Sequence, residues 1–227
     1  MQLKDFIPNV KKEFGKTFFS GISFDSSKVK KNHIFFAIKG NKFDGNKFIP
    51  LAIKNGSRII VSEKKSDKYK NGILFINKKN IRKLLAEVSS KIYNKKPKNL
   101  IAVTGTNGKS SVSDFYYQIL RLNKKRVASI GTLGVKAENL NIKLSNTTID
   151  PIQLSQILQK IKNQKIDNVI MEASSHGLIQ NRLDGYKFNL GIFTNLSQDH
   201  LDYHKNLDAY LKAKLYLFKN LIKKKDI

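Results

Sequence analysis

A short glycine turn that ends in lysine and serine carries the clearest chemistry in this sequence. The segment Gly105–Ser110 reads GTNGKS and follows the apolar run Leu100–Val103. Such a turn aims backbone N–H groups at one point, where Lys109 would neutralise nucleotide β/γ-phosphates and the Ser110 hydroxyl would bind Mg²⁺. The usual phosphate loop has a glycine five residues before its Gly-Lys pair, where this chain has Val103. The turn alone leaves a solvated loop open as an alternative, and the flanking elements favour the nucleotide site.

Two further polar groups follow apolar runs that read as strands. Glu172 comes directly after Asn168–Met171, and a carboxylate there is the usual second protein ligand of phosphate-bound Mg²⁺. Asn195 follows Leu190–Thr194, and the segment 199–204 (DHLDYH) then holds four potential metal ligands. Helix-capping acids in ordinary polar loops would give the same pattern, so both interpretations remain open at this point.

The last helical segment places a lysine among apolar residues. Lys214 lies three residues after Leu211 and four before Phe218. In a lysine-rich chain the usual explanation is a side chain that runs along the apolar face to reach water. A lysine facing the core beside metal-ligand candidates would instead be functional or chemically modified, and we favour that interpretation. The apolar stripe comprises Leu207, Tyr210, Leu211, Leu215, Phe218, Leu221 and Ile222.

The elements around these residues alternate between strand and helix. We predict strands at Leu100–Thr104, Arg126–Ile130, Asn168–Ala173 and Leu190–Thr194. Helices are predicted at 110–122, where Val112, Phe115, Tyr116, Ile119 and Leu120 recur at helical spacing, and at Pro151–Gln164, capped by Asp150. This alternation predicts a mostly parallel sheet with its ligands at the carboxyl ends of the strands.

The first part of the chain reads as a separate small α/β unit. Strands are predicted at His33–Ile38, Arg58–Ser62 and Ile73–Ile76, and helices near Pro50–Lys54 and from Ile81 to Val88. The polar segment 94–99 (NKKPKN) is the expected boundary. We therefore expect an α/β protein with one domain over residues 1–95 and a second over residues 96–227.

Composition limits the classes of protein to consider. The 227 residues include 43 lysines and arginines and 17 acids, for a net charge of +26. The excess is scattered lysine with only five arginines, which favours a solvated surface over a specific nucleic-acid site. Cysteine is absent, so disulfides and thiolate metal sites are excluded. Neither a membrane-span-length apolar segment nor a signal region is found, and we expect a cytoplasmic monomer without membrane contact.

Taken in series, these motifs resemble one family of enzymes. TGTNGKS, NTT, MEASSHGLIQNR, TNLSQDHLDYH and AYLKAK are similar in order and spacing to the Mur ligase family. The resemblance is closest to the members that add the third residue of the peptidoglycan stem peptide. The segment from FDSSKVKK to SRIIV is similar to that family's UDP-binding domain. The resemblance therefore implies a small N-terminal UDP-binding domain followed by an ATP-binding central domain with a phosphate loop.

The resemblance also implies roles for individual residues. Lys109, Glu172, His200 and Lys214 would be the catalytic set, and Ser110, Glu172, His200 and a carbamylated Lys214 would bind Mg²⁺. ATP would be held by Gly105, Thr106, Asn107, Gly108, Lys109, Ser110 and Ser111. The muramyl substrate would contact Phe24, Ser26, Asn41, Lys42 and Phe43 in the first domain, and Asn146, Thr147, Thr148, Ser174, Gln180 and Arg182 in the second.

The implied reaction is an ATP-dependent ligation. The D-Glu carboxylate of UDP-MurNAc-L-Ala-D-Glu would attack the ATP γ-phosphate, and the amine of diaminopimelate or lysine would displace phosphate from the acyl phosphate. Two departures stand out: Ser27 replaces the family's usual arginine, and the chain ends at Ile227, before the remaining central domain and the amino-acid-binding domain. We therefore expect an incomplete chain that does not complete the ligation.

Three alternatives stay open at this stage. The chain could be a non-catalytic module that binds a nucleotide or a UDP-sugar. It could also be a ligase similar to folylpolyglutamate synthases, or a basic nucleic-acid-binding protein with a fortuitous phosphate loop. The absence of arginine or aromatic patterning makes the last the weakest.

Overall fold

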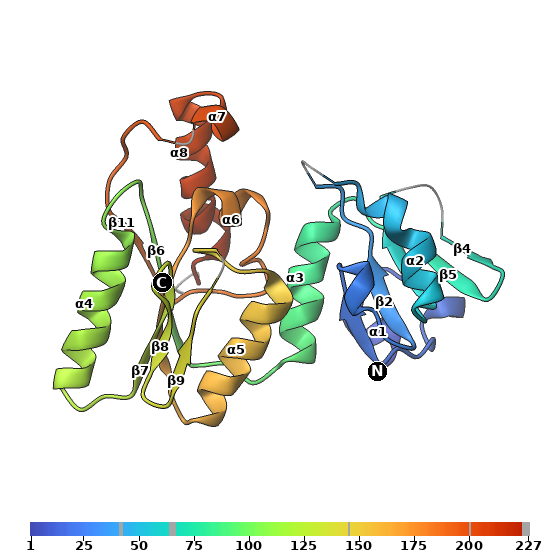
Figure 1. The fold of residues 1–227 in the computed structure, drawn as a ribbon, viewed down its shortest axis with the longest axis horizontal. Helices are drawn as coiled ribbons and strands as arrows, with labels where there is room; N and C mark the ends of the chain where they lie inside the picture. Colours follow the sequence, from blue (N-terminus) through green and yellow to red (C-terminus); the bar gives the residue numbers. More distant parts are fainter. Residues whose placement is uncertain (41–42, 64–66, 145, 200, 224–227) are drawn as a thin grey trace. The chain divides into compact units, whose positions relative to one another are not determined.

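The computed structural model describes residues 1–40, 43–63, 67–144, 146–199 and 201–223, and the chain divides into two compact units (Figure 1). The first unit is Met1–Ile92 and the second is Tyr93–Ile227. Both are α/β structures built on mostly parallel sheets, which confirms the predicted fold class. No helix within the described ranges is both long and apolar enough to cross a membrane.

The first unit is organised on a five-stranded sheet with the order β1-β2-β3-β5-β4. Its strands are β1 (Gly21–Ser23), β2 (His33–Phe36), β3 (Ile59–Ser62), β4 (Lys68–Lys70) and β5 (Ile73–Asn77), and only β4 runs antiparallel to its neighbour. All four residues of β3 are buried, as expected for a parallel strand covered on both faces. Strand β2 ends two residues before its predicted end, although Ala37 N still donates to Val61 O at 2.9 Å.

Helices complete the first unit. They are α1 (Leu3–Phe6), α2 (Ile49–Lys54) and α3 (Ile81–Ile92), together with 3₁₀ turns at Lys12–Phe14, Ser26–Lys28 and Gly45–Phe48. Helix α3 begins as predicted, because the Asn80 side chain accepts a hydrogen bond from Lys83 N at 3.0 Å. Its buried face includes Ile81, Leu84, Leu85 and Val88, which repeat at helical spacing.

The second unit contains a six-stranded sheet with the order β11-β6-β10-β7-β8-β9. The strands are β6 (Asn99–Thr104), β7 (Val127–Gly131), β8 (Gly134–Ala137), β9 (Leu140–Ile142), β10 (Asn168–Glu172) and β11 (Leu190–Phe193). The four predicted strands, β6, β7, β10 and β11, are parallel to one another, so their carboxyl ends meet at one edge. The antiparallel pair β8 and β9 was not predicted, because these short, partly polar segments lack a clear alternation.

Helices pack on both sides of this sheet, and Figure 1 shows α4 and α5 on opposite sides of it. Helix α5 (Pro151–Asn163) starts at Asp150, whose side chain accepts from Ile152 N and Gln153 N. It buries Leu154, Ile157, Leu158 and Ile161 in a core shared with β6, β7 and β10. The remaining helices are α4 (Lys109–Leu122), α6 (Ser175–Ile179), α7 (Leu201–His204) and α8 (Leu207–Tyr216), which continues as a π-helical turn at Leu217–Leu221.

Helix α4 has the predicted extent, but its apolar spacing does not mark a buried face. Phe115 and Ile119 are 61% and 57% exposed, whereas Ser113 is buried. The buried residue of α4 is therefore the small Ser113, and the helix packs against β7 and β10.

Backbone pairing also ties α8 to the sheet. Phe188 N donates to Leu221 O at 2.7 Å, and Lys223 N donates to Phe188 O at 2.8 Å. These bonds join the end of the last helical segment to the chain just before β11. The helix that carries Lys214 is thereby anchored beside the strands that carry the other candidate residues.

Candidate nucleotide-phosphate site

The glycine turn connects β6 to α4 and takes a conformation that needs glycine at two positions. Gly105 has φ +148° and Gly108 has φ +82°, and Gly108 is the residue that precedes the first turn of α4. A Cβ atom on Gly105 would lie 1.9 Å from Thr194 Oγ1. The predicted sequence of strand, turn and helix is present, and the helix N-terminus opens at the turn.

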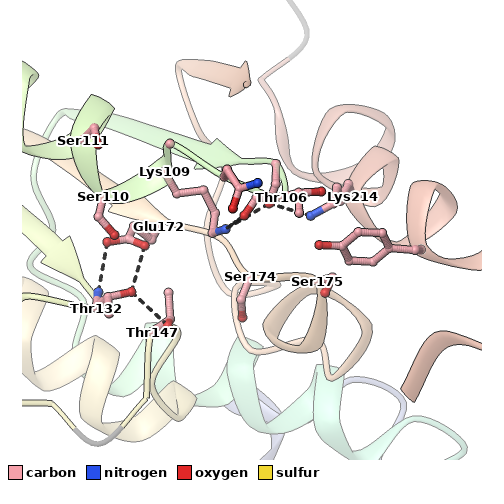
Figure 2. Close-up of a pocket in the computed structure, with 14 residues that line it drawn as sticks. Thr106, Lys109, Ser110, Ser111, Thr132, Thr147, Glu172, Ser174, Ser175 and Lys214 are labelled. Carbon is pink, nitrogen blue, oxygen red and sulfur yellow. Dashed lines mark hydrogen bonds between the residues drawn. The ribbon is translucent and has the colours of Figure 1, made fainter. Parts of the chain in front are cut away.

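A pocket of about 260 Å³ lies at this edge of the sheet (Figure 2). It gathers the turn and the ends of several strands in one place, as expected for a parallel sheet. Thr132, Ser175 and Tyr210 belong to it although the sequence analysis did not propose them as site residues and named Tyr210 only on the apolar stripe. Its lining residues are Gly105, Thr106, Asn107, Gly108, Lys109, Ser110, Ser111, Thr132, Thr147, Glu172, Ser174, Ser175, Tyr210 and Lys214.

Lys109 is held against the turn itself. Its Nζ donates to Gly105 O at 3.0 Å and to Thr106 O at 2.7 Å. Burial lowers the pKa of Lys109, and the carboxylates of Glu172 and Asp199 oppose that effect. A cation partly removed from water beside a set of backbone N–H groups suits a polyanionic ligand.

Glu172 ends β10 and is fixed by the end of the neighbouring strand β7. Its Oε1 accepts from Thr132 N at 2.9 Å and its Oε2 accepts from Thr132 Oγ1 at 3.0 Å. A Cβ on Gly131 would lie 2.2 Å from Glu172 Oε1, so glycine is required for the carboxylate to occupy this place. Thr132 follows a predicted strand, so the strand-end rule that selected Glu172 could also have found it.

Lys214 is almost fully removed from solvent, with 1% of its surface exposed. Its Nζ donates to Gly105 O at 2.6 Å and lies 4.0 Å from the centre of the Tyr210 ring. Burial, and next the neighbouring Lys109 cation, lower the pKa of Lys214 to about 8, against the opposing effect of Asp199. The prediction that this lysine faces the core is confirmed.

The apolar stripe predicted around Lys214 is displaced in the structure. The buried residues of the last helical segment are Tyr210, Ala213, Lys214, Leu217 and Leu221. Leu207, predicted on the stripe, is 38% exposed in the first turn of α8, and Leu211 and Leu215 are half-buried. The buried face therefore includes Lys214, as predicted, together with Ala213 and Leu217, which were not on the predicted stripe.

Next to Lys214, four rings join α6, α7 and α8. His204 is 4% exposed, and its Nε2 lies 2.9 Å from Ser175 Oγ. The His204 ring lies 4.9 Å from Tyr210, and the His176 ring lies 4.1 Å from Tyr203, measured between ring centres. The second histidine of the DHLDYH segment therefore packs between helices.

The candidate substrate residues of the second unit form one hydrogen-bonded group beside the pocket. Thr148 Oγ1 donates to Glu172 O at 3.1 Å and accepts from Ser174 N at 2.9 Å. Arg182 donates to Gln180 Oε1 from Nε at 3.1 Å and from Nη2 at 2.7 Å, and it also donates to Thr148 O. This network ties Thr148, Gln180 and Arg182 to the backbone that follows β10.

The remaining candidate substrate residues do not all lie at the pocket. Thr147 lines the pocket, with its hydroxyl 3.0 Å from that of Thr132, and Asn146 is exposed beside it. Phe24, Ser26 and Phe43 belong to the first unit, where Phe24 and Phe43 are exposed and Ser26 is buried. Asn41, Lys42 and His200 lie outside the described residues.

Ser27, expected to replace an arginine of the family, forms local contacts with Asp25. Its backbone N–H and its hydroxyl both donate to Asp25 Oδ1, at 2.9 and 2.7 Å. The hydroxyl contact is the main cause that holds the pKa of the Asp25 carboxyl below its usual range. Ser27 therefore completes the cap of a 3₁₀ turn, a role that an arginine side chain would not fill in the same way.

Comparison with known families identifies the chain. The profile of the Mur ligase middle domain matches residues 103–227, and that of the Mur ligase family catalytic domain matches residues 19–103. The chain belongs to the Mur ligase family. Two curated relatives are the UDP-N-acetylmuramoyl-L-alanyl-D-glutamate--2,6-diaminopimelate ligases of Rickettsia montanensis, 43% identical over 216 residues, and of Brucella melitensis, 40% identical over 212 residues. Each match covers 93% of this chain, but 45% and 43% of the relatives, so the chain spans less than half of their length.

Solved structures show the same relationship. A structure of a UDP-N-acetylmuramoyl-L-alanyl-D-glutamate--2,6-diaminopimelate ligase matches 98% of this chain with a TM-score of 0.83 and 31% identity, over 46% of its own chain. The MurF ligase from Thermotoga maritima in complex with ADP matches 88% of the chain, over 43% of its own, with a TM-score of 0.55 and 20% identity. The second likeness concerns the fold alone.

Proposed function

We propose that this chain supplies the ATP-phosphate site and the muramyl-substrate site of a ligase that adds diaminopimelate to UDP-MurNAc-L-Ala-D-Glu. The observation that carries the proposal is the convergence of the glycine turn, Lys109, Glu172 and the buried Lys214 on one pocket. The family and the two curated relatives support this ligase over a folylpolyglutamate-synthase-like one and over a simple binding module. Lysine as the added amino acid is the second candidate.

The protein's own residues would bind and orient the reactants. Lys109 would release the carbonyls of Gly105 and Thr106 to contact the β/γ-phosphates, where a fixed cation stabilises the charge of the transferring group. Bound ATP supplies the phosphoryl group that activates the D-Glu carboxylate. Arg182, held by Gln180 and Thr148, would orient a carboxylate of the substrate beside Ser174.

The donor atoms present suit Mg²⁺. The Ser110 hydroxyl and the Glu172 carboxylate are hard oxygen donors on one pocket, and Mg²⁺ usually takes one or two protein oxygens in addition to phosphates and water. Among the residues that the structure describes, no three acids or histidines cluster to form a complete protein cage for a metal. We infer that Ser110 and Glu172 would hold the ion jointly with the nucleotide, and that His200 would join them.

Lys214 is also compatible with carbamylation. Its Nζ donates to Gly105 O. Loss of one proton from the ammonium gives the amine, and formation of the N–C bond to CO₂ releases a second proton, so the carbamate keeps one N–H for that bond. The product replaces a buried cation with an anion able to bind a second Mg²⁺. We propose this modification for Lys214, and mass spectrometry after trapping of the carbamate would test it.

Calorimetry on the whole 227-residue chain tests the proposed function. We expect binding of ADP with Mg²⁺, and loss of that binding in Lys109→Met, while Lys212→Met, an exposed lysine of α8, binds as the unchanged chain does. We also expect binding of UDP-MurNAc-L-Ala-D-Glu. A chain that binds neither ligand would overturn the proposal. Cell fractionation and light scattering would test the cytoplasmic location and monomeric state, which we also propose.

A further inference from the structure

We propose that Thr194 and Asn195, which follow β11, are positioning residues that set the direction of the peptide groups of the phosphate loop. The inference rests on the proposed nucleotide site and goes beyond it, because it assigns part of the loop's structure to a segment about 90 residues away in sequence. The turn lacks the first glycine of the usual phosphate loop, because position 103 is valine.

Asn195 holds the first two peptide groups of the turn in the same orientation. Thr106 N donates to Asn195 O at 3.0 Å, and Asn107 N donates to Asn195 Oδ1, also at 3.0 Å. In a planar trans peptide the C=O points opposite to the N–H. The carbonyls of these two peptides, Gly105 O and Thr106 O, are therefore directed away from Asn195.

Those two carbonyls face the lysines of the site. Gly105 O accepts from both Lys214 Nζ and Lys109 Nζ, and Thr106 O accepts from Lys109 Nζ. The bonds to Asn195 thus decide which carbonyl oxygen atoms accept hydrogen bonds from Lys109 and Lys214. Without these bonds to Asn195, either peptide group could rotate. Its N–H would then face the lysine ammonium group in place of its carbonyl oxygen.

The third peptide group is held in the reverse orientation. Asn107 O accepts from Thr194 Oγ1 at 2.6 Å and from Asn195 Nδ2 at 3.3 Å. The N–H of the same peptide belongs to Gly108, and it is therefore directed away from Thr194 and Asn195. Gly108 lines the pocket, and its φ of +82° accommodates the reversal. The reversal presents an N–H group to an anion where a carbonyl would repel it.

Close packing explains why the two segments depend on one another. The position of the Thr194 hydroxyl requires glycine at 105, because a Cβ there would meet it at 1.9 Å. Ser197 N and O exchange hydrogen bonds with Thr106 Oγ1 at 3.0 and 3.2 Å. The phosphate loop of this chain is therefore a composite of residues 105–110 and residues 194–197.

The experiment measures ADP binding with Mg²⁺ by calorimetry, and thermal stability, on the full chain. Thr194→Val removes the hydroxyl, which donates to Asn107 O at 2.6 Å and has a longer contact of 3.4 Å with Thr104 O, and Thr194→Ser keeps it. Asn195→Ala is matched by Asn189→Ala, which loses a similar bond from Leu100 N to its side-chain oxygen at the opposite end of β11. We expect about tenfold weaker binding for Thr194→Val and Asn195→Ala, and binding within about twofold of the original for Thr194→Ser and Asn189→Ala.

Each outcome has a distinct meaning. If the unchanged chain binds no ADP, the proposed nucleotide site fails and this inference fails with it. If the unchanged chain binds ADP and Thr194→Val and Asn195→Ala bind equally well, only the inference is overturned. The inference would also be overturned if Asn195→Ala and Asn189→Ala lost the same amount of ADP affinity and had equal melting temperatures. Loss of a side-chain hydrogen bond at either end of β11 would then have the same effect on binding. If Asn195→Ala does not fold, the Val and Ser variants of Thr194 decide the matter.

Discussion

Replacing the buried Lys214 with methionine should stabilise the nucleotide-free protein at neutral pH. Burial and Lys109 lower the pKa of Lys214 from 10.5 to about 8, so at pH 7 the folded chain retains a cation that water would stabilise better. Methionine has a similar length, carries no charge and fits an apolar environment. The carbonyl of Gly105 keeps Lys109 as a donor after the substitution.

The size of the effect follows from the pKa. Lowering the pKa of Lys214 from 10.5 to about 8 corresponds to a loss of about 3 kcal/mol in the free energy of unfolding while the lysine is charged. The side chain is only 1% exposed, so solvent screens this charge little. The lost contacts with Gly105 O and the Tyr210 ring offset about 1–2 kcal/mol. We therefore expect a net stabilisation of about 1–2 kcal/mol and a melting temperature higher by a few degrees.

The pH dependence provides a second measurement. Between pH 8 and 10.5 the unfolded chain binds more protons at Lys214 than the folded chain, so the free energy of unfolding rises with pH in that window. We expect the unchanged chain to gain about 2 kcal/mol between pH 7 and 9.5, and Lys214→Met to lack that gain. Buffers free of CO₂ keep the amine unmodified.

Differential scanning calorimetry suits this test because the two units can unfold in separate transitions. The matched control is Lys212→Met on the exposed side of α8, which should leave both the stability and its pH dependence unchanged. If Lys214→Met were less stable at pH 7, or if the unchanged chain showed no gain between pH 7 and 9.5, the argument from a desolvated cation would be wrong.

Three further changes test other contacts. Gly131→Ala places a Cβ 2.2 Å from Glu172 Oε1, so it should destabilise the chain by about 1–3 kcal/mol and remove the Mg²⁺-dependent part of ADP affinity. An unchanged free energy of unfolding in urea and an unchanged ADP affinity by calorimetry would contradict this. Thr132→Val removes the hydroxyl bound to Glu172 Oε2 and should cost about 1 kcal/mol in urea denaturation, with Thr132→Ser as the control. Tyr186→Phe removes a buried bond of 2.8 Å to Ser155 Oγ and should cost about 1 kcal/mol. Burial raises the pKa of Tyr186 to about 12, so between pH 10 and 12 the folded chain keeps a proton that the unfolded chain loses. The free energy of unfolding of the unchanged chain should therefore fall with pH in that window. Tyr186→Phe lacks this proton, so its free energy of unfolding should fall less steeply.

Much of the site was predictable from the sequence because its signals are local. The turn around Gly105 and Gly108 needs backbone angles that glycine adopts most readily, and the apolar runs on either side specify a strand and a helix. Glu172 was selected by its place at the end of an apolar run, and Lys214 by its position among apolar residues at helical spacing. Such features depend on residues a few positions apart.

The tertiary structure decided which of these features meet and what holds them. Thr132 lies 40 residues from Glu172, and Asn195 lies 88 residues from Asn107, so neither contact has a local signal. They form because the strand order β11-β6-β10-β7 places the ends of these strands side by side. The sequence by itself therefore determined the phosphate turn and its candidate partners. The pairing of distant strands determined the orientation of its peptide groups, because hydrogen bonds from another strand end decide which way each peptide faces.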